Sequence, residues 1–276
     1  MLVYDGHVHT PFCPHGTADP FEEYIEKAIS LGLKGMTFTE HAPLPYGFTD
    51  PTPEQDSGMK SEELLPYFET LKQLQSKYKH QITINIGLEV DYIEEFERET
   101  RELLDEWGDY LDDAILSVHF LKNNEKYFCL DFSPEMFEEL AEEAGSISKV
   151  YEAYYKTVEK AILSDLGVNK PKRIGHLTLI RKFQKKFPVE KTYEETVVHL
   201  LDLMKRKHYE LDYNGAGFSK PLCKEPYPPA WVINEAVKRN IPLIYGSDAH
   251  SVKGMAQGFQ QLYLANATTS PSLLKG

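Results

Sequence analysis

The chain opens with Met1-Leu2-Val3-Tyr4-Asp5-Gly6-His7-Val8-His9, in which an apolar run passes into a polar motif. The apolar run predicts a buried strand, and the motif lies at its carboxyl end. Residues two apart on an extended chain point the same way, so the imidazoles of His7 and His9 can reach one ion. A helix is predicted next, from an N-cap at Asp19 to a stop at Gly32. The chain therefore begins with a strand, a loop and a helix.

The same alternation of strand and helix continues along the chain. Seven apolar runs predict strands, at residues 1–4, 33–39, 82–88, 114–118, 173–175, 209–213 and 241–245. Helical spacing of apolar residues is found between them, at 61–78, 97–106, 134–166, 193–207 and 229–239. Such alternation implies parallel strands joined by right-handed crossovers, either closed into a barrel or open as a doubly wound sheet.

The polar residues at the strand ends favour the barrel. In chain order they are His7 and His9, Glu40 and His41, Glu89, His119, His176, Asn214, and Asp248 with His250. Barrel enzymes carry their functional residues at the carboxyl ends of several strands, so one pocket can gather all of these. An open sheet would spread them along a line. We therefore predict an α/β barrel formed by a single domain over residues 1–276.

The chemistry of this set points to a metal centre. Neutral imidazoles and carboxylates suit Zn, Fe or Mn, and the near absence of cysteine from the set argues against a closed structural zinc site. Taken singly, His119 or His176 is better explained as a hydrogen-bonded core histidine, and Glu89 as a paired acid at a strand end. Together, so many unmetallated acids and imidazoles would be costly in desolvation and like-charge repulsion. Within the same region, Glu40 is expected to hydrogen-bond to a metal ligand without binding metal itself, and Cys13 is expected to be a packing residue.

The order of these motifs resembles the polymerase and histidinol phosphatase (PHP) superfamily. The resemblance runs from residue 7 to residue 250, from His7-x-His9 to Ser247-Asp248-x-His250. The segments Glu40-His41-Ala42-Pro43, Gly87-Leu88-Glu89 and Asp212-Tyr213-Asn214 are most similar to bacterial histidinol-phosphate phosphatases. The fold that this resemblance implies is a distorted (β/α)7 barrel, similar to a TIM barrel, with the metal site at the carboxyl ends of the strands.

The resemblance also implies three divalent metal ions. His7, His9, Glu89 and Asp248 would bind the first ion, and Glu89 would bridge to the second. His119 and His176 would complete the second site, and His15, His41 and His250 would bind the third ion.

The implied activity is hydrolysis of L-histidinol phosphate to L-histidinol and phosphate, a step of histidine biosynthesis. A metal-bound hydroxide would attack phosphorus, with Glu89, Asp248 and Arg181 as catalytic residues. Arg181 would also grip the phosphate, and Lys220 and Asn214 would contact the substrate. The family pattern leads us to expect an arginine where Ser219 stands.

Three other functions compete with this one. A related PHP phosphoesterase would use the same metal ligands on another small phosphate ester or a nucleotide. A non-catalytic polymerase-accessory module would be expected to lack ligands, and none is missing here. An amidohydrolase-type barrel also opens with His-x-His but needs a strand-borne lysine where Glu89 stands.

The composition of the chain limits the kinds of molecule that it is expected to bind. A net charge of −13 argues against a general nucleic-acid surface, because affinity for a polyanion comes largely from clustered Lys and Arg. No apolar stretch is long enough to cross a bilayer, and three scattered cysteines fit a reducing cytoplasm.

The loop at 42–60 fits either a lid, whose acids Asp50, Glu54 and Asp56 would meet the substrate's cationic groups, or a surface loop without a role. Residues 268–276 are expected to fray.

Overall fold

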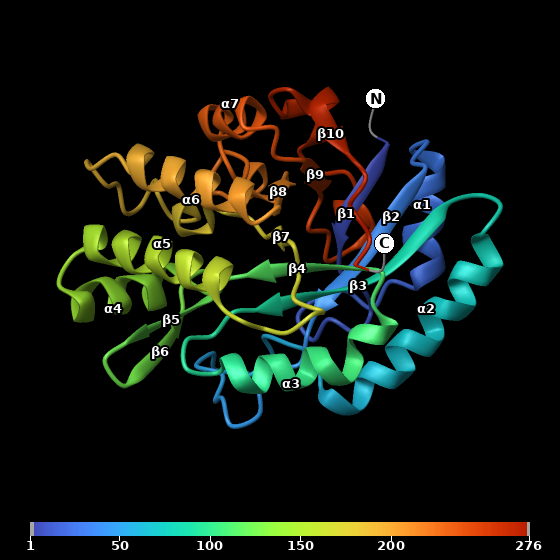
Figure 1. The fold of residues 1–276 in the computed structure, drawn as a ribbon, viewed down its shortest axis with the longest axis horizontal. Helices are drawn as coiled ribbons and strands as arrows, with labels where there is room; N and C mark the ends of the chain where they lie inside the picture. The colour runs from blue at the N-terminus through green and yellow to red at the C-terminus, as the bar shows by residue number, and fades with distance from the viewer. Residues whose placement is uncertain (1–2, 275–276) are drawn as a thin grey trace.

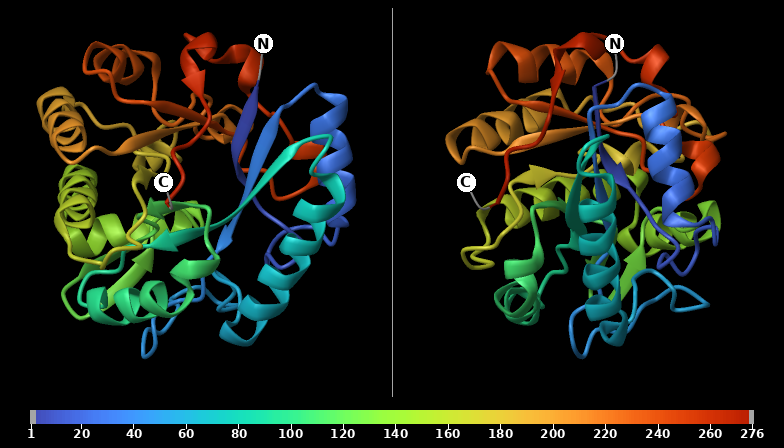
Figure 2. Two further views of the ribbon diagram at one scale, coloured as in Figure 1. Left: turned by 45° about the vertical axis from the view of Figure 1, so that its right-hand side comes forward. Right: turned by 90° about the vertical axis from the view of Figure 1, so that its right-hand side faces the viewer.

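The computed structural model describes residues 3–274 and contains a parallel barrel surrounded by helices (Figures 1 and 2). The main sheet has the strand order β1-β2-β3-β4-β7-β8-β9-β10, and all of its pairs are parallel. Its strands are β1 (Tyr4–Val8), β2 (Gly35–His41), β3 (Thr83–Asp91), β4 (Asp113–Ser117), β7 (Arg173–Ile174), β8 (Glu210–Asn214), β9 (Leu243–Gly246) and β10 (Thr268–Thr269). The helices are α1 (Phe21–Ser30), α2 (Leu64–Tyr78), α3 (Glu97–Trp107), α4 (Pro134–Ala144), α5 (Ile147–Leu163), α6 (Glu194–Arg206) and α7 (Ala230–Lys238). Short 3-10 turns are η1 (Ser61–Glu63), η2 (Gly108–Tyr110), η3 (Leu179–Arg181), η4 (Ala216–Phe218), η5 (Val252–Gly254), η6 (Phe259–Gln261) and η7 (Ala265–Ala267).

The barrel closes where the chain leaving β9 meets the end of β1. Val8 forms a parallel bridge with Ala249, the backbone N–H of His9 donates to the Ala249 carbonyl at 3.0 Å, and the Asp248 N–H donates to the His7 carbonyl at 2.7 Å. The closure is formed by the two ends of the predicted motif set. All seven predicted strands are present, each within a few residues of its expected position, and the distorted (β/α)7 barrel is confirmed.

The helices follow the sequence prediction with two corrections. Asp19 is not an N-cap: its carboxylate accepts from the Thr17 hydroxyl at 2.7 Å and from the Val252 N–H at 2.8 Å, and α1 begins after Pro20. The segment 134–166 is two helices, because Gly145 takes a left-handed conformation (φ 87°) and the Ser146 hydroxyl caps α5 by accepting from a backbone N–H.

Two further segments depart from the prediction. An antiparallel hairpin, β5 (Phe120–Asn123) and β6 (Lys126–Cys129), follows β4 directly and was not predicted. The C-terminal segment is not frayed where the structure describes it, since Thr268 and Thr269 pair with β9 and the Leu274 N–H donates to the Asp112 carbonyl at 2.9 Å.

A buried polar layer crosses the barrel interior. The Arg173 guanidinium is 1% exposed and donates to the Asp113 carboxylate at 2.7 Å and to the Gly6 carbonyl at 2.9 Å. A Cβ at Gly6 would lie 2.5 Å from an Arg173 nitrogen, so this close approach requires glycine. The layer joins β1, β4 and β7 without using any predicted metal ligand. No helix within residues 3–274 is both long and apolar enough to span a membrane.

Candidate metal centre

The nine predicted metal ligands converge at the carboxyl ends of the strands. They come from β1 and its following loop (His7, His9, His15), from β2 and β3 (His41, Glu89), and from the segments after β4, β7 and β9 (His119, His176, Asp248, His250). Seven of the nine line one hollow of about 470 Å³. The other two, His7 and His9, are fully buried and lie against Glu89 beneath it.

Glu89 occupies the centre of this cluster. Its Oε2 lies 3.2 Å from His7 Nε2 and 3.5 Å from His9 Nε2. Its Oε1 lies 2.8 Å from His176 Nε2 and 3.8 Å from His119 Nε2. Three sets of donor atoms result, each gathered within 4.8 Å: His7, His9 and Glu89; Glu89, His119 and His176; and His9, Cys13, His41 and His250. The two carboxylate oxygens of Glu89 therefore face different histidine pairs, as a bridging ligand would require.

Three of the histidines are held from behind by carboxylates. The pairs are His7 Nδ1 with Asp212 at 3.1 Å, His9 Nδ1 with Glu40 at 3.1 Å, and His119 Nδ1 with Asp91 at 2.8 Å. An ionised carboxylate only accepts hydrogen bonds, so it keeps the proton on Nδ1 and leaves the Nε2 lone pair for a metal. Glu40 takes the supporting position predicted for it. Asp91 and Asp212 were not predicted, although each lies two residues from a predicted site residue on the same strand.

The remaining nitrogens also fit metal binding. His15 Nδ1 donates to the Asp56 carbonyl at 2.9 Å and His250 Nδ1 donates to the Asp248 carbonyl at 3.1 Å, which leaves Nε2 as the lone-pair donor in both rings. Within the described residues, the buried His9 Nε2 and His41 Nδ1 make no hydrogen bond of good geometry, although each lies 3.2 Å from a carboxylate oxygen, of Asp248 and Glu89 respectively. Buried polar atoms without partners are costly, and a cation among them would satisfy their lone pairs. The donor set is therefore suited to divalent metal ions.

Comparison with known proteins places the chain in a family. The profile of the PHP domain matches residues 5–216. The chain belongs to the PHP-domain family.

The similar proteins share one name. The histidinol-phosphatase of Bacillus subtilis is 46% identical over 262 residues, which cover 94% of this chain and 98% of that protein. A crystal structure from Listeria monocytogenes, of a protein provisionally assigned as a histidinol phosphatase, is 38% identical with a TM-score of 0.91 and covers 94% of this chain and 100% of that one. Histidinol phosphate phosphatase from Lactococcus lactis, solved with zinc, L-histidinol and phosphate, shares the fold at a TM-score of 0.68 and 21% identity, covering 91% of this chain and 87% of that one.

Electrostatics keep Glu89, the central acid of this PHP centre, ionised. Burial alone would raise the pKa of Glu89, but the charges of His7 and His41 hold it well below its usual value. Burial alone would lower the pKa of His9, but Asp248 and Glu40 raise it to about 9. Glu89 is therefore ionised, and the acids around His9 favour its protonated form.

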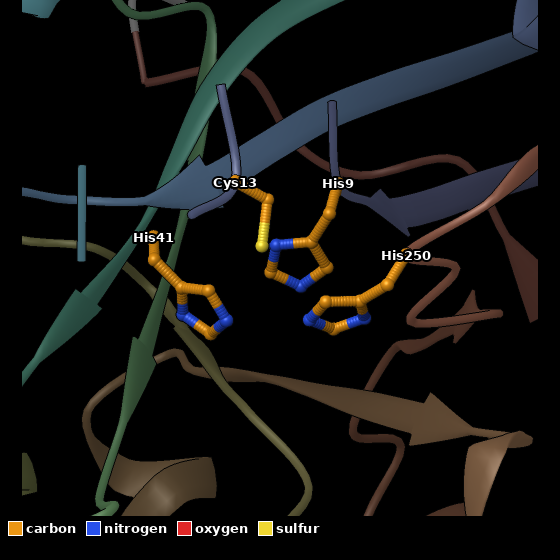
Figure 3. Close-up of side chains that lie close together, drawn as sticks. All are labelled: His9, Cys13, His41 and His250. Atoms are coloured by element: carbon orange, nitrogen blue, oxygen red, sulfur yellow. The ribbon is translucent and has the colours of Figure 1, made fainter. Parts of the chain in front are cut away.

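Cys13 lies in the third donor set, beside three imidazoles of this PHP centre. Figure 3 shows its sulfur against the ring of His9, with His41 and His250 around the same space. Burial, followed by the negative charge of Glu40, raises the pKa of the thiol, so it stays protonated. A protonated thiol in a buried position fits the packing role predicted for it.

The predicted substrate contacts are placed differently. Arg181 forms an ion pair with Glu225 and lines a separate, smaller hollow of about 160 Å³. Asn214 is buried, and its amide donates to Asp212 and to Asp248 at 3.2 Å each. Lys220 lines the metal hollow. Sequence reasoning missed the other cation there, Lys182, which immediately follows Arg181.

A substitution at Asp212 tests whether the carboxylates that hydrogen-bond to the histidines strengthen metal binding in this PHP protein. Replacing Asp212→Asn is expected to weaken metal binding at the His7 site about 10- to 100-fold, because a neutral amide no longer stabilises the Nδ1–H of His7. Metal titration of the stripped protein measures this. Asp105→Asn on α3, where the side chain is 50% exposed and does not line the metal hollow, is the matched control. Equal metal affinity in both variants would show that Asp212 does not support the ligand.

Proposed function

We propose that this chain is a histidinol-phosphatase of histidine biosynthesis, which hydrolyses L-histidinol phosphate to L-histidinol and inorganic phosphate. The observation that carries the proposal is the convergence of eight donor residues around Glu89, seven of the nine lining one hollow and His7 and His9 lying beneath it. The 46% identity to the Bacillus subtilis histidinol-phosphatase, over nearly the full length of both chains, supports the substrate. We place the reaction in the cytoplasm, in keeping with the three free cysteines Cys13, Cys129 and Cys223.

We assign the ligands to three divalent ions, Zn, Fe or Mn, as the family resemblance implies. His7, His9, Glu89 and Asp248 would hold the first, Glu89 with His119 and His176 the second, and His15, His41 and His250 the third. The donor sets support the first two groups, whereas the third set contains His9 and Cys13 with His41 and His250 and does not include His15. When bound, such ions stabilise charge on phosphoryl oxygens and lower the pKa of a bound water from about 15.7 to about 7. No protein nucleophile is then required for an attack on phosphorus.

The chain's own residues orient this chemistry. Asp248 has a left-handed backbone (φ 52°), an unusual conformation for a residue other than glycine, and Asn214 holds its carboxylate toward His9. Burial raises the pKa of Asp248, but His7 and His9 lower it well below its usual value. We therefore assign Asp248 to holding metal and not to protonating the leaving alkoxide.

The leaving group is proposed to lie beside Asp56 and Phe132 in the same hollow. Asp56 and the aromatic ring of Phe132, which is 46% exposed, both line the hollow. A carboxylate and an exposed ring suit the ammonium and imidazole of histidinol. Of the other acids in the loop at 42–60, Asp50 already accepts hydrogen bonds on its carboxylate from the backbone N–H groups of Thr52 and Ser57.

Release of phosphate from a panel of esters tests the function. Metal-loaded protein, with its metals identified by elemental analysis, is expected to turn over L-histidinol phosphate with a higher kcat/KM than other small phosphomonoesters or nucleotides. A higher kcat/KM for another ester would transfer the assignment to the related-phosphoesterase alternative. Stoichiometric metal without turnover of any ester would instead favour the non-catalytic module.

A further inference from the structure

Two lysines face the metal hollow from separate loops. Lys182 follows η3, Lys220 follows η4, and both side chains line the hollow together with Glu89 and Asp248. We propose that Lys182 and Lys220, and not Arg181, bind the phosphoryl group, while Arg181 positions the two loops that carry them. This inference rests on the proposed phosphatase function and deepens it.

Lys182 retains hydrogen-bonding capacity for a ligand. Its side chain is 19% exposed, and its ammonium donates to one Asp131 oxygen at 2.8 Å. An ammonium has three N–H donors, so two remain for phosphoryl oxygens. Burial alone would lower the pKa of Lys182, but the charge of Asp131 raises it. Lys182 therefore stays cationic inside the hollow.

Asp131 places this lysine close to the second donor set. The Asp131 carboxylate would be neutralised by burial, but Lys182 and then His119 lower its pKa strongly. Leu130, the residue before Asp131, donates its backbone N–H to the His119 carbonyl at 2.9 Å, and His119, His176 and Asp131 all line the hollow. The Lys182 ammonium thus lies on the side of the hollow where Glu89, His119 and His176 converge.

Arg181 points away from this hollow for a geometric reason. Consecutive residues in a 3-10 turn are about 120° apart around its axis, so Arg181 at the end of η3 and Lys182 just after it leave the backbone in different directions. Arg181 instead lines the smaller hollow with Tyr151, Tyr155 and Trp231. Its guanidinium is already paired there with Glu225.

The Arg181 ion pair joins the two lysine-bearing loops. Glu225 belongs to the segment that begins at η4 and carries Lys220. Two more bonds hold the same loops together: the Lys185 N–H donates to the Leu222 carbonyl at 3.1 Å, and the Gln184 amide donates to the Cys223 carbonyl at 3.1 Å. Loss of the ion pair would therefore change the spacing of Lys182 and Lys220 without removing either charge.

The two lysines account for the serine at position 219. Ser219 lines the hollow where the family pattern leads us to expect an arginine, and Lys220 is the adjacent cation. A lysine is a point charge on a flexible stem, whereas arginine binds through a fixed planar fork. Two lysines on facing loops can bind a phosphoryl group from both sides, in a protein whose net charge of −13 would otherwise repel it.

Binding of inorganic phosphate tests the assignment. Metal-loaded Lys182→Met is expected to bind phosphate about 10- to 100-fold more weakly, since each charge-assisted hydrogen bond has that value. Lys220→Met should lose about 3- to 10-fold, because an exposed cation is more strongly screened. Arg181→Met should raise KM for the ester more than it lowers kcat. Lys185→Met, in the same basic run with an exposed side chain, should match the wild type.

Two further variants separate ligand binding from folding. Lys182→Met leaves Asp131 buried and unpaired, which can destabilise the protein, whereas Lys182→Met with Asp131→Leu removes both charges. Lys182→Arg keeps the charge and should retain most of the phosphate affinity. Metal content measured on every variant should equal that of the wild type.

Several outcomes would overturn the assignment. The assignment is wrong if Lys182→Met and Lys220→Met, at full metal content, both bind phosphate as tightly as the wild type. It is also wrong if Arg181→Met loses more phosphate affinity than either lysine variant. Absence of phosphate binding by the wild type would also overturn it. If the wild type cleaves another phosphomonoester and not histidinol phosphate, the proposed substrate fails, but a selective loss of phosphate affinity in the lysine variants still supports the assignment.

Discussion

Glu89→Gln is expected to lower kcat for phosphate release on the order of 1,000-fold and to reduce the metal content of the purified protein. Both oxygens of the native carboxylate are in use, Oε2 beside His7 at 3.2 Å and Oε1 beside His176 at 2.8 Å. A glutamine keeps one acceptor and replaces the other with an N–H donor. One of the two histidine pairs would then face a donor where a shared anion is needed, and two adjacent cations would lose their common ligand.

The control for this variant is Glu102→Gln on α3, whose side chain is 67% exposed. It makes the same chemical change without touching the hollow and should keep full activity and metal content. Phosphate release and elemental analysis on the two proteins provide the comparison. If Glu89→Gln kept the wild-type kcat and its full metal content, Glu89 would not be a bridging ligand, and the proposed arrangement of the ions would be wrong.

The barrel could be predicted because parallel strands buried on both faces appear as continuous apolar runs. Each run ends where the strand reaches the carboxyl edge, and there the sequence changes to histidine, acid or asparagine. The closing contact, Val8 with Ala249, joins the two outermost motifs and follows from the same pattern. The hairpin of β5 and β6 was missed because each strand has only four residues and Lys122, Asn123 and Lys126 interrupt the apolar pattern.

The metal ligands were easier to predict than the groups around them. Histidines that recur at the ends of successive strands stand out in a sequence. Asp91 and Asp212 do not stand out from other acids, because only the folded structure shows that they form hydrogen bonds with His119 and His7. The phosphate contacts were harder to predict for another reason. Whether Arg181 or the next residue faces the hollow depends on the rotation of a 3-10 turn, and neighbouring basic residues in a sequence do not indicate that rotation.

Exhaustive chelation is expected to abolish turnover while leaving a folded barrel. The buried layer of Arg173 and Asp113 and the hydrophobic core do not depend on the metal ligands, so cooperative thermal unfolding should persist at a lower Tm. Phosphate release before and after chelation, and after adding back Zn, Mn or Fe singly, measures the dependence and identifies the effective metal. Turnover of a phosphomonoester by fully stripped protein would exclude the metal-dependent scheme.

Metal return to the stripped protein should release protons. Burial opposes charge on His9 and His119, yet Asp248 and Glu40 raise the pKa of His9 to about 9 and Asp91 raises the pKa of His119 to about 10. Both imidazoles are therefore protonated at pH 7.5 in the metal-free protein, and a metal binds only the neutral ring. Calorimetric titration in buffers of different ionisation enthalpy should show proton release at pH 7.5, and metal affinity should rise as the pH approaches 9. Binding at pH 7.5 without proton release would mean that the acids around these rings do not hold protons on them, and that the centre is preformed in its neutral state.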